Sequence, residues 1–172
     1  MIKKIGIIGA GTMGSGIAAA SSINGFETLL YDIYPEAVQK AVSGISKGFQ
    51  KLEEKGKIDA AKRKAAEGNI IQVNDLAGLA ECDIIIEAAI ENIDLKKELY
   101  KKLDEVTKPE AILATNTSSF SITSISTAVK NNPGRVAGMH FFNPANIMKL
   151  VEVIKGEFTS DETVNAVTEL CK

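Results

Sequence analysis

The chain contains a single histidine, His140, between a short apolar run and an Asn-Pro pair. An unperturbed imidazole has a pKa of about 6.5, so it can take a proton from a hydroxyl group or return one near neutral pH. Glu152 follows inside another apolar run. A carboxylate on the second ring nitrogen would fix the tautomer of the imidazole and stabilise its protonated form. The two residues are therefore a candidate acid–base pair.

These two side chains need strands that bring them together. His140 is expected to end an apolar strand, Val136–Met139, and Glu152 stands between two valines of the next run. A return through the intervening segment would lay the runs side by side and make Glu152 an inward, partly buried carboxylate that needs a partner. The residues alone leave an alternative open, in which His140 bonds a backbone carbonyl and Glu152 lies on a solvated strand face.

A second cluster lies near the start of the chain, where a GxGxxG pattern follows an apolar run and opens a helical stretch. In a dinucleotide fold Gly9 allows the tight turn, Gly11 lets the backbone approach a pyrophosphate, and Gly14 lets the helix pack on the sheet. The phosphates then meet the positive end of the helix dipole. The loop residues expected at the cofactor are Gly9, Gly11, Thr12, Met13 and Gly14.

Asp32 ends the next apolar run, 18 residues past Gly14. A carboxylate at this place accepts hydrogen bonds from the ribose hydroxyls of NAD and repels the 2′-phosphate of NADP. No arginine follows Asp32 in the segment Ile33-Tyr34-Pro35. The sequence therefore predicts NAD rather than NADP as the cofactor. A cofactor of this kind implies hydride transfer, which needs an acid–base group such as His140 at the reacting oxygen.

The remaining pattern predicts a doubly wound α/β fold of Rossmann type. Short runs rich in β-branched residues alternate with stretches at helical spacing, which indicates a parallel sheet with right-handed crossovers. The first helix is expected from about Met13 to Asn24. The expected strands are Ile2–Ile8, Thr28–Tyr31, Ile70–Val73, Ile84–Ala89 and Ile112–Ala114.

The crossover over residues 33–68 is too long for one ordinary helix. A long helix is expected from Pro35, because proline is favoured at the first helical position, and Gly56 is expected to end it. The following IDAAKRKAAEG segment predicts a shorter partner helix. A helical hairpin is thus inserted between strands 2 and 3, either as a solubilising excursion or as an arm over a ligand.

Bulk composition predicts one domain over residues 1–172. A net charge of −2 gives no general attraction to nucleic acid or to an anionic membrane, and no apolar stretch approaches the ~20 residues that span a bilayer. Cys82 and Cys171, one semi-buried thiol and one near the chain end, form no ligand pattern, so no metal site is predicted. Such cysteine usage suits a reducing compartment and a cytoplasmic protein.

Four motifs in the same order carry a resemblance to a known family: GIIGAGTMGSGIA, IIEAAIEN, NTSS and HFFNP…MKLVEV. Together they resemble the L-3-hydroxyacyl-CoA dehydrogenases, in particular the bacterial 3-hydroxybutyryl-CoA dehydrogenases of butyrate-forming anaerobes. The resemblance covers the whole chain and extends to the helical hairpin. It implies NAD-dependent interconversion of (S)-3-hydroxybutyryl-CoA and acetoacetyl-CoA, in butyrate-type fermentation or fatty acid metabolism. The rivals are a non-catalytic NAD-binding module and a dehydrogenase of a free 3-hydroxy acid.

The resemblance also implies roles for individual residues. His140 matches the catalytic histidine of the family, Glu152 the glutamate that orients it, and Ser118 a serine that contacts the substrate oxygen and the nicotinamide. Further cofactor-contacting positions match Glu91, Lys96 and Asn143. On this reading CoA lies across the hairpin, where its phosphates could meet Lys51, Lys55 and Lys57.

Each of these positions also has a plain structural interpretation. Ser118 or Ser119 could be the N-cap of the next helix, and Glu91 could be a first-turn helix charge. Lys96 could be a solvated helix lysine and Asn143 a turn residue before Pro144. The three hairpin lysines could simply lie on a solvated helix face.

The TSDETVNAVTELCK segment predicts a last helix capped by Ser160 or Thr159, with nothing at its end to close it. The chain is therefore expected to stop inside a helix at Lys172. Members of the family continue with a helical domain that makes the dimer and completes the substrate pocket. By the resemblance, this domain is absent here, the full-length protein is a homodimer or higher homo-oligomer, and the present chain is weakly active.

Overall fold

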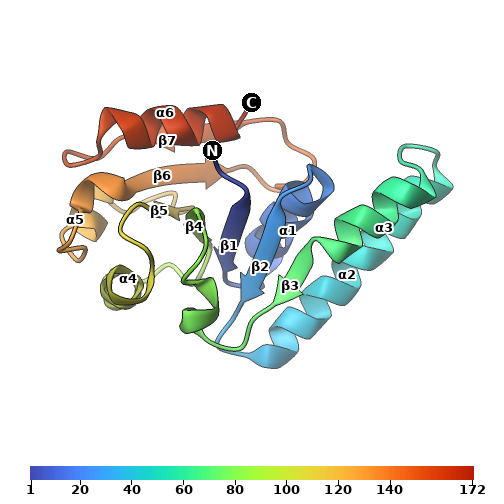
Figure 1. Ribbon diagram of the computed structural model, residues 1–172, viewed down its shortest axis with the longest axis horizontal. Coiled ribbons are helices and arrows are strands. Elements are labelled where there is room, and N and C mark those ends of the chain that lie inside the picture. Colours follow the sequence, from blue (N-terminus) through green and yellow to red (C-terminus); the bar gives the residue numbers. More distant parts are fainter.

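A sheet buried on both faces accounts for the apolar runs of the sequence. The computed structural model describes residues 1–172 and contains one seven-stranded sheet in the order β3-β2-β1-β4-β5-β6-β7 (Figure 1). All neighbouring pairs are parallel except β6 and β7, which are antiparallel. The strands are β1 (Lys4–Ile8), β2 (Glu27–Tyr31), β3 (Ile70–Gln72), β4 (Ile84–Glu87), β5 (Ile112–Thr115), β6 (Val136–Phe141) and β7 (Val151–Ile154).

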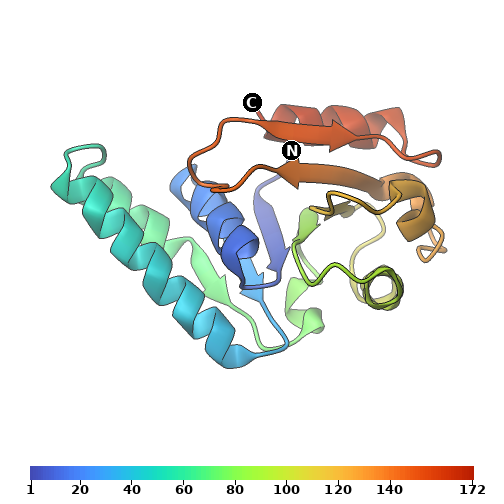
Figure 2. The same cartoon turned by 180° about the vertical axis from the view of Figure 1, so that it is seen from behind.

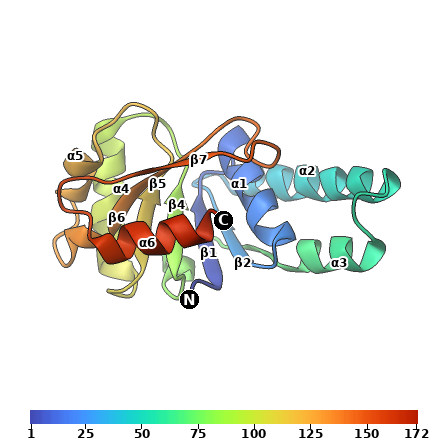
Figure 3. The ribbon, with the colours of Figure 1, turned by 90° about the horizontal axis from the view of Figure 1, so that it is seen from above.

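Helices cover both faces of the sheet, which confirms the doubly wound α/β prediction. They are α1 (Thr12–Ile23), α2 (Pro35–Glu54), α3 (Ala60–Gly68), α4 (Ile93–Val106), α5 (Ile122–Ser126) and α6 (Asp161–Leu170). The short 3₁₀ helices are η1 (Leu76–Leu79) and η2 (Pro133–Arg135). Seen from above, α6 lies along β6 and β7, against which it packs (Figure 3).

Strand β4 shows how the two cores are divided. Successive side chains of a strand point to opposite faces. Ile84 and Ile86 therefore join the core formed with α1, α2 and α3, whereas Ile85 joins the core formed with η1, α4 and α5. All three side chains are buried, as a central strand of a parallel sheet requires.

The long crossover forms the expected helical hairpin. Helices α2 and α3 lie between β2 and β3 and project beyond the edge of the sheet (Figures 1 and 2). Val38, Ala41, Ile45 and Phe49 recur at helical spacing and bury one face of α2. Gly56 has a φ of 65° and follows the last turn of α2, where a left-handed conformation ends the helix.

Several expected boundaries are wrong. Strand β1 begins at Lys4 rather than Ile2. Strand β4 ends at Glu87 rather than Ala89, because the Ala89 N–H donates to the Glu87 carboxylate instead of to a neighbouring strand. Ser160 caps α6 by accepting from the Thr163 N–H, and α6 extends to Leu170. Strand β7 reverses direction because the short segment after β6 returns the chain beside it.

Cys82 is fully buried rather than semi-buried, and burial raises the pKa of its thiol to about 12. No helix of the chain has the length and apolar character needed to cross a membrane.

Candidate active site

The glycine loop between β1 and α1 is shaped by two close approaches and one open space. A Cβ atom on Gly9, whose φ is +100°, would lie 2.6 Å from the Ala88 carbonyl oxygen. A Cβ on Gly14 would lie 1.7 Å from the Gly9 oxygen, whereas a Cβ on Gly11 would meet nothing within 4 Å. Gly11 is the N-cap of α1 and offers no side chain to its free N–H groups. The open space and these donors fit a pyrophosphate.

Asp32 follows β2 and bonds directly to this loop. Its Oδ2 accepts from the Ala10 N–H at 2.7 Å, and its Oδ1 accepts from the Tyr34 N–H at 3.0 Å. The carboxylate is thereby held at the carboxyl ends of β1 and β2, the edge at which open α/β sheets bind ligands. Asp32 lines the cavities on both sides of the loop, together with Gly11. The residues present therefore fit a dinucleotide.

His140 and Glu152 are direct partners on adjacent strands. The antiparallel register pairs them, and His140 Nδ1 lies 2.8 Å from Glu152 Oε2. Strand β6 runs through Phe141, so His140 lies inside the strand rather than ending it. The expectation of a partly buried Glu152 is wrong: its side chain is 54% exposed because β7 is the edge strand, and that of His140 is 23% exposed. The ring of Phe142 packs 4.9 Å from the imidazole, centroid to centroid.

Ser118 and Asn143 line a cavity of about 350 Å³ together with His140. Ser118 lies in the loop after β5 and is exposed. Neither Ser118 nor Ser119 is a helix cap, because Ser121 caps α5 by accepting from the Ser124 N–H. The exposed Ser118 is therefore free of the structural role that the sequence left open.

Glu91 and Lys96 belong to a partly buried polar network that the sequence did not predict. Lys96 Nζ bridges Glu87 at 2.6 Å and Glu91 at 3.0 Å, and its side chain is only 2% exposed. The interpretation of Lys96 as a solvated helix lysine is therefore wrong. Glu91 precedes α4, whose N-cap is Asn92, so it is not a first-turn helix charge either.

Glu91 Oε1 accepts from Thr117 Oγ1 at 2.6 Å and from the Ser118 N–H at 3.2 Å. Burial works to raise the pKa of Glu91, but the hydrogen bonds from Thr117 and Lys96 outweigh it, and the pKa lies below its ordinary value. Thr117 was missed by the sequence analysis, although it stands next to Ser118 in the NTSS motif. Glu91 therefore stays ionised beside the cavity that Ser118 and His140 share.

The hairpin lysines do not form one cluster. Lys55 and Lys57 line a groove of about 930 Å³ between the hairpin and the segment after β6, and Asn143 lines it too. Lys51 is exposed on α2 and does not line this groove. Lys40, which the sequence analysis passed over, does line it. No group of three or more His, Cys, Asp or Glu side chains is placed so that it could hold a metal ion.

The loop, the helix N-terminus and the carboxylate after β2 define a dinucleotide-binding domain of Rossmann type, with an imidazole–carboxylate pair near its cofactor face. Residues 4–172 match the family model of the 3-hydroxyacyl-CoA dehydrogenase NAD-binding domain. The chain belongs to this family, and NAD is its cofactor.

Named relatives and solved structures agree with this assignment. The chain is 45% identical to a 3-hydroxyadipyl-CoA dehydrogenase of Escherichia coli K12, over 98% of its own length and 35% of the relative. It is 43% identical to a 3-hydroxybutyryl-CoA dehydrogenase of Clostridioides difficile, over 98% of its length and 60% of the relative. The crystal structure of (S)-3-hydroxybutyryl-CoA dehydrogenase from Ralstonia eutropha superposes with a TM-score of 0.96 at 42% identity, covering 99% of this chain and 60% of that one. The chain thus spans only part of each relative.

Proposed function

We propose that this chain is the cofactor-binding and acid–base part of an NAD-dependent 3-hydroxyacyl-CoA dehydrogenase that interconverts (S)-3-hydroxybutyryl-CoA and acetoacetyl-CoA. The observation that carries the proposal is the 2.8 Å contact between His140 Nδ1 and Glu152 Oε2, at a cavity that Ser118 also lines. The metabolic setting we propose is butyrate-type fermentation or fatty acid metabolism.

The geometry divides the work between the two ring nitrogens of His140. Nδ1 bonds the Glu152 carboxylate, which leaves Nε2 to exchange a proton with the oxygen on C3 of the substrate. In the reducing direction the imidazolium donates this proton, and in the oxidising direction the neutral ring accepts it. Glu152 stabilises the imidazolium, and the Ser118 hydroxyl donates to the same oxygen. Bound NADH supplies the hydride to C3.

The groove along the hairpin suits the rest of the acyl-CoA. Lys55 and Lys57 line this groove and carry the positive charge that CoA phosphates need. Asn143 lines both the groove and the His140 cavity, so the two spaces are adjacent at this residue. We therefore assign the CoA phosphates to Lys55 and Lys57; Lys51 does not line the groove and has no part in the proposed site.

The site is open to water in this chain. The exposure of His140 and Glu152 lets solvent screen their interaction, which weakens electrostatic stabilisation of the transition state. We therefore propose that the 172-residue chain binds NADH but turns over slowly. The complete enzyme, in this proposal, is a homodimer or larger homo-oligomer whose further helical domain closes the site.

The proposal is tested by NADH oxidation with three compounds: acetoacetyl-CoA, 3-oxoadipyl-CoA and free acetoacetate. The second CoA ester is included because one relative is named for 3-hydroxyadipyl-CoA. We expect turnover with acetoacetyl-CoA that exceeds the rate of a His140→Ala variant. Saturable NADH binding without any turnover would instead indicate a non-catalytic module. Equal rates with acetoacetate and its CoA ester would indicate a dehydrogenase of free acids.

A further inference from the structure

Glu87 is a fully buried carboxylate for which the proposed chemistry has no use. It is the last residue of β4, and its exposed fraction is 0%. Its Oε1 accepts from Lys96 Nζ at 2.6 Å and from the Ala89 N–H at 2.7 Å. Its Oε2 accepts from Thr115 Oγ1 on the adjacent strand at 2.8 Å. A buried carboxylate is retained only when it is paired and hydrogen-bonded in this way.

The partner of Glu87 is shared with the cavity. Lys96 lies in the first turn of α4, and its ammonium group contacts Glu87 on one side and Glu91 on the other. Glu91 is 42% exposed and lines the cavity beside Ser118 and His140. Apart from His140, Glu91 and Lys96 are the only acidic or basic side chains that line this cavity.

The charges of the network do not balance. Two carboxylates, Glu87 and Glu91, share one ammonium group, so the network carries a net charge of −1. Lys96 contacts both carboxylates and cannot balance both, and Glu91 is the one whose side chain is exposed at the cavity wall, so the net negative charge of the network faces the cavity there. Without Glu87, the ammonium of Lys96 would instead neutralise Glu91.

We propose that Glu87 is a positioning residue. By sharing Lys96 with Glu91 it keeps the network at a net negative charge at the nicotinamide end of the cofactor site, which favours binding of NAD⁺ over NADH. The inference rests on the proposed function, in which the nicotinamide occupies the cavity lined by Ser118 and His140. The oxidised ring carries a positive charge that the reduced ring lacks. A carboxylate at the cavity wall therefore attracts NAD⁺ more strongly than NADH.

The obvious alternative is that Glu87 only braces the fold. In that case its loss would weaken the binding of both cofactor forms equally, and the ratio of their dissociation constants would not move. The ratio of the NAD⁺ and NADH dissociation constants therefore distinguishes an electrostatic role of Glu87 from a purely structural one.

The test is Glu87→Gln, which keeps the shape and an acceptor oxygen but removes the charge. Dissociation constants for NAD⁺ and NADH are measured by calorimetric titration of the chain without substrate, at one pH and low salt. We expect the ratio of the NAD⁺ constant to the NADH constant to rise about threefold to tenfold, because one unit of negative charge is removed from the network beside the cavity. A ratio equal to that of the wild type overturns the proposal.

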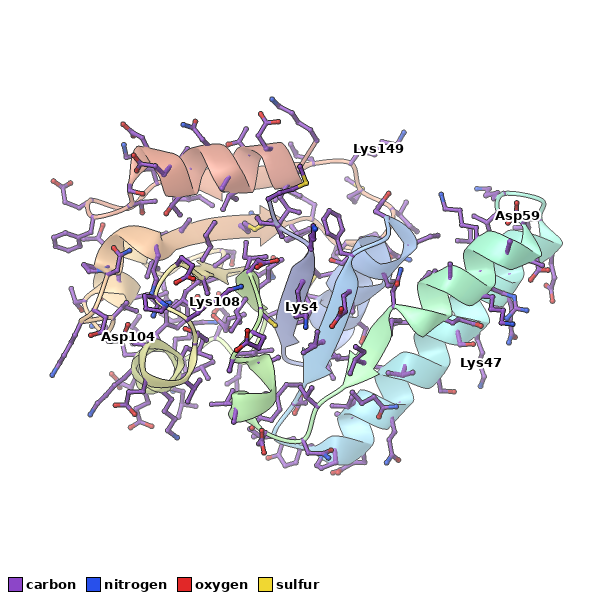
Figure 4. The ribbon with its side chains drawn as sticks, in the orientation of Figure 1. Lys4, Lys47, Asp59, Asp104, Lys108 and Lys149 are labelled. Atoms are coloured by element: carbon purple, nitrogen blue, oxygen red, sulfur yellow. The ribbon has the colours of Figure 1, made fainter.

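Asp104→Asn is the matched control. Asp104, labelled in Figure 4, is also a buried carboxylate on α4. It pairs with Arg135 at 2.8 Å. It lies eight residues after Lys96, about 12 Å along the helix, and does not line the cavity. We expect this variant to lose stability but to keep the wild-type ratio. A shift equal to that of Glu87→Gln would show that the ratio merely reports a weakened helix, and would refute the proposal.

Two further variants keep the proposal testable if Glu87→Gln alone does not fold. Adding Lys96→Met to Glu87→Gln removes both charges of the buried pair and restores the net charge of −1, so the ratio should return toward that of the wild type. Glu91→Gln removes the charge at the cavity without breaking the buried pair, and should raise the ratio; no change in this variant overturns the proposal. Failure of the wild-type chain to bind either cofactor form would instead refute the proposed function.

Discussion

Replacing Gly14 by alanine, and comparing it with the same change at Gly11, should separate the two roles of the glycine loop, which are close packing of α1 and binding of the cofactor. The added Cβ would lie 1.7 Å from the Gly9 carbonyl oxygen and 2.8 Å from its carbon. These atoms are backbone, so they cannot swing aside, and α1 must move away from the loop. Overpacking costs about 1–3 kcal/mol, and this contact belongs at the upper end of that range. The better helix propensity of alanine offsets about 1 kcal/mol. We expect a net loss of about 2 kcal/mol in the free energy of unfolding.

The control for Gly14→Ala is Gly11→Ala, three residues earlier in the same loop. Its Cβ would meet nothing within 4 Å, and the backbone of Gly11, with φ −72° and ψ −167°, is open to alanine. We expect its stability to stay within about 1 kcal/mol of the wild type, the scale of a lost N-cap preference. Its methyl group fills the space assigned to the pyrophosphate, so NADH affinity should fall at least tenfold.

Urea unfolding and NADH fluorescence titration on the two variants give the required pair of numbers. We expect each variant to lose a different property: Gly14→Ala loses stability, and Gly11→Ala loses cofactor affinity while remaining folded. A Gly14→Ala variant as stable as the wild type would refute the packing argument. Unchanged NADH affinity in Gly11→Ala would refute the location of the pyrophosphate.

Three further predictions concern single side chains. His140→Ala should lower turnover about 10²–10⁴-fold in a steady-state assay while NADH affinity stays near that of the wild type. Asp32→Ala should reduce the preference for NAD(H) over NADP(H), measured as the ratio of dissociation constants. Burial works to raise the pKa of Asp83, but the Lys108 ammonium and the N–H groups of Lys3 and Lys4 lower it to about 2. The Asp83 carboxylate therefore stabilises the fold above about pH 4, and this stability is lost as the pH falls toward about 2; Asp83→Asn should flatten this part of an acid unfolding curve.

Different results would contradict these arguments. A collapse of NADH affinity in His140→Ala would make the histidine a structural residue. Tighter binding of NADP(H) than NAD(H) by the wild-type chain would refute the role given to Asp32. Equal acid sensitivity of the wild type and Asp83→Asn would show that other carboxylates control unfolding at low pH.

The pairing of His140 with Glu152 could be anticipated because both lie in apolar runs joined by a short segment. Two strands so connected are neighbours in most sheets. The exposure of Glu152 could not be anticipated, because it depends on β7 being the last strand of the sheet. Local sequence determines which strands are adjacent more readily than which strand is left at the edge.

The network around Glu87 could not be predicted from the sequence for a related reason. In the sequence, Glu87 interrupts one long apolar run, and the run was interpreted as a strand through Ala89. Its partners come from elsewhere: Thr115 from the strand that pairs with β4, and Lys96 from the helix that covers it. A carboxylate at the end of a fully buried strand was the available signal, and sheet order was needed to interpret it.

The place of β7 at the edge of the sheet has a consequence for motion. This strand pairs only with β6, so its amide groups can separate from the sheet by local fraying without unfolding of β1, β4 and β5. Each such opening would part Glu152 from His140 and remove the stabilising carboxylate for as long as it lasts. The lifetime of the pair is then set by fraying of one strand rather than by global unfolding. Hydrogen exchange should accordingly be faster for the β7 amides than for those of β4. If cofactor or substrate slows the exchange of the β7 amides, ligand binding stabilises the pairing of His140 with Glu152.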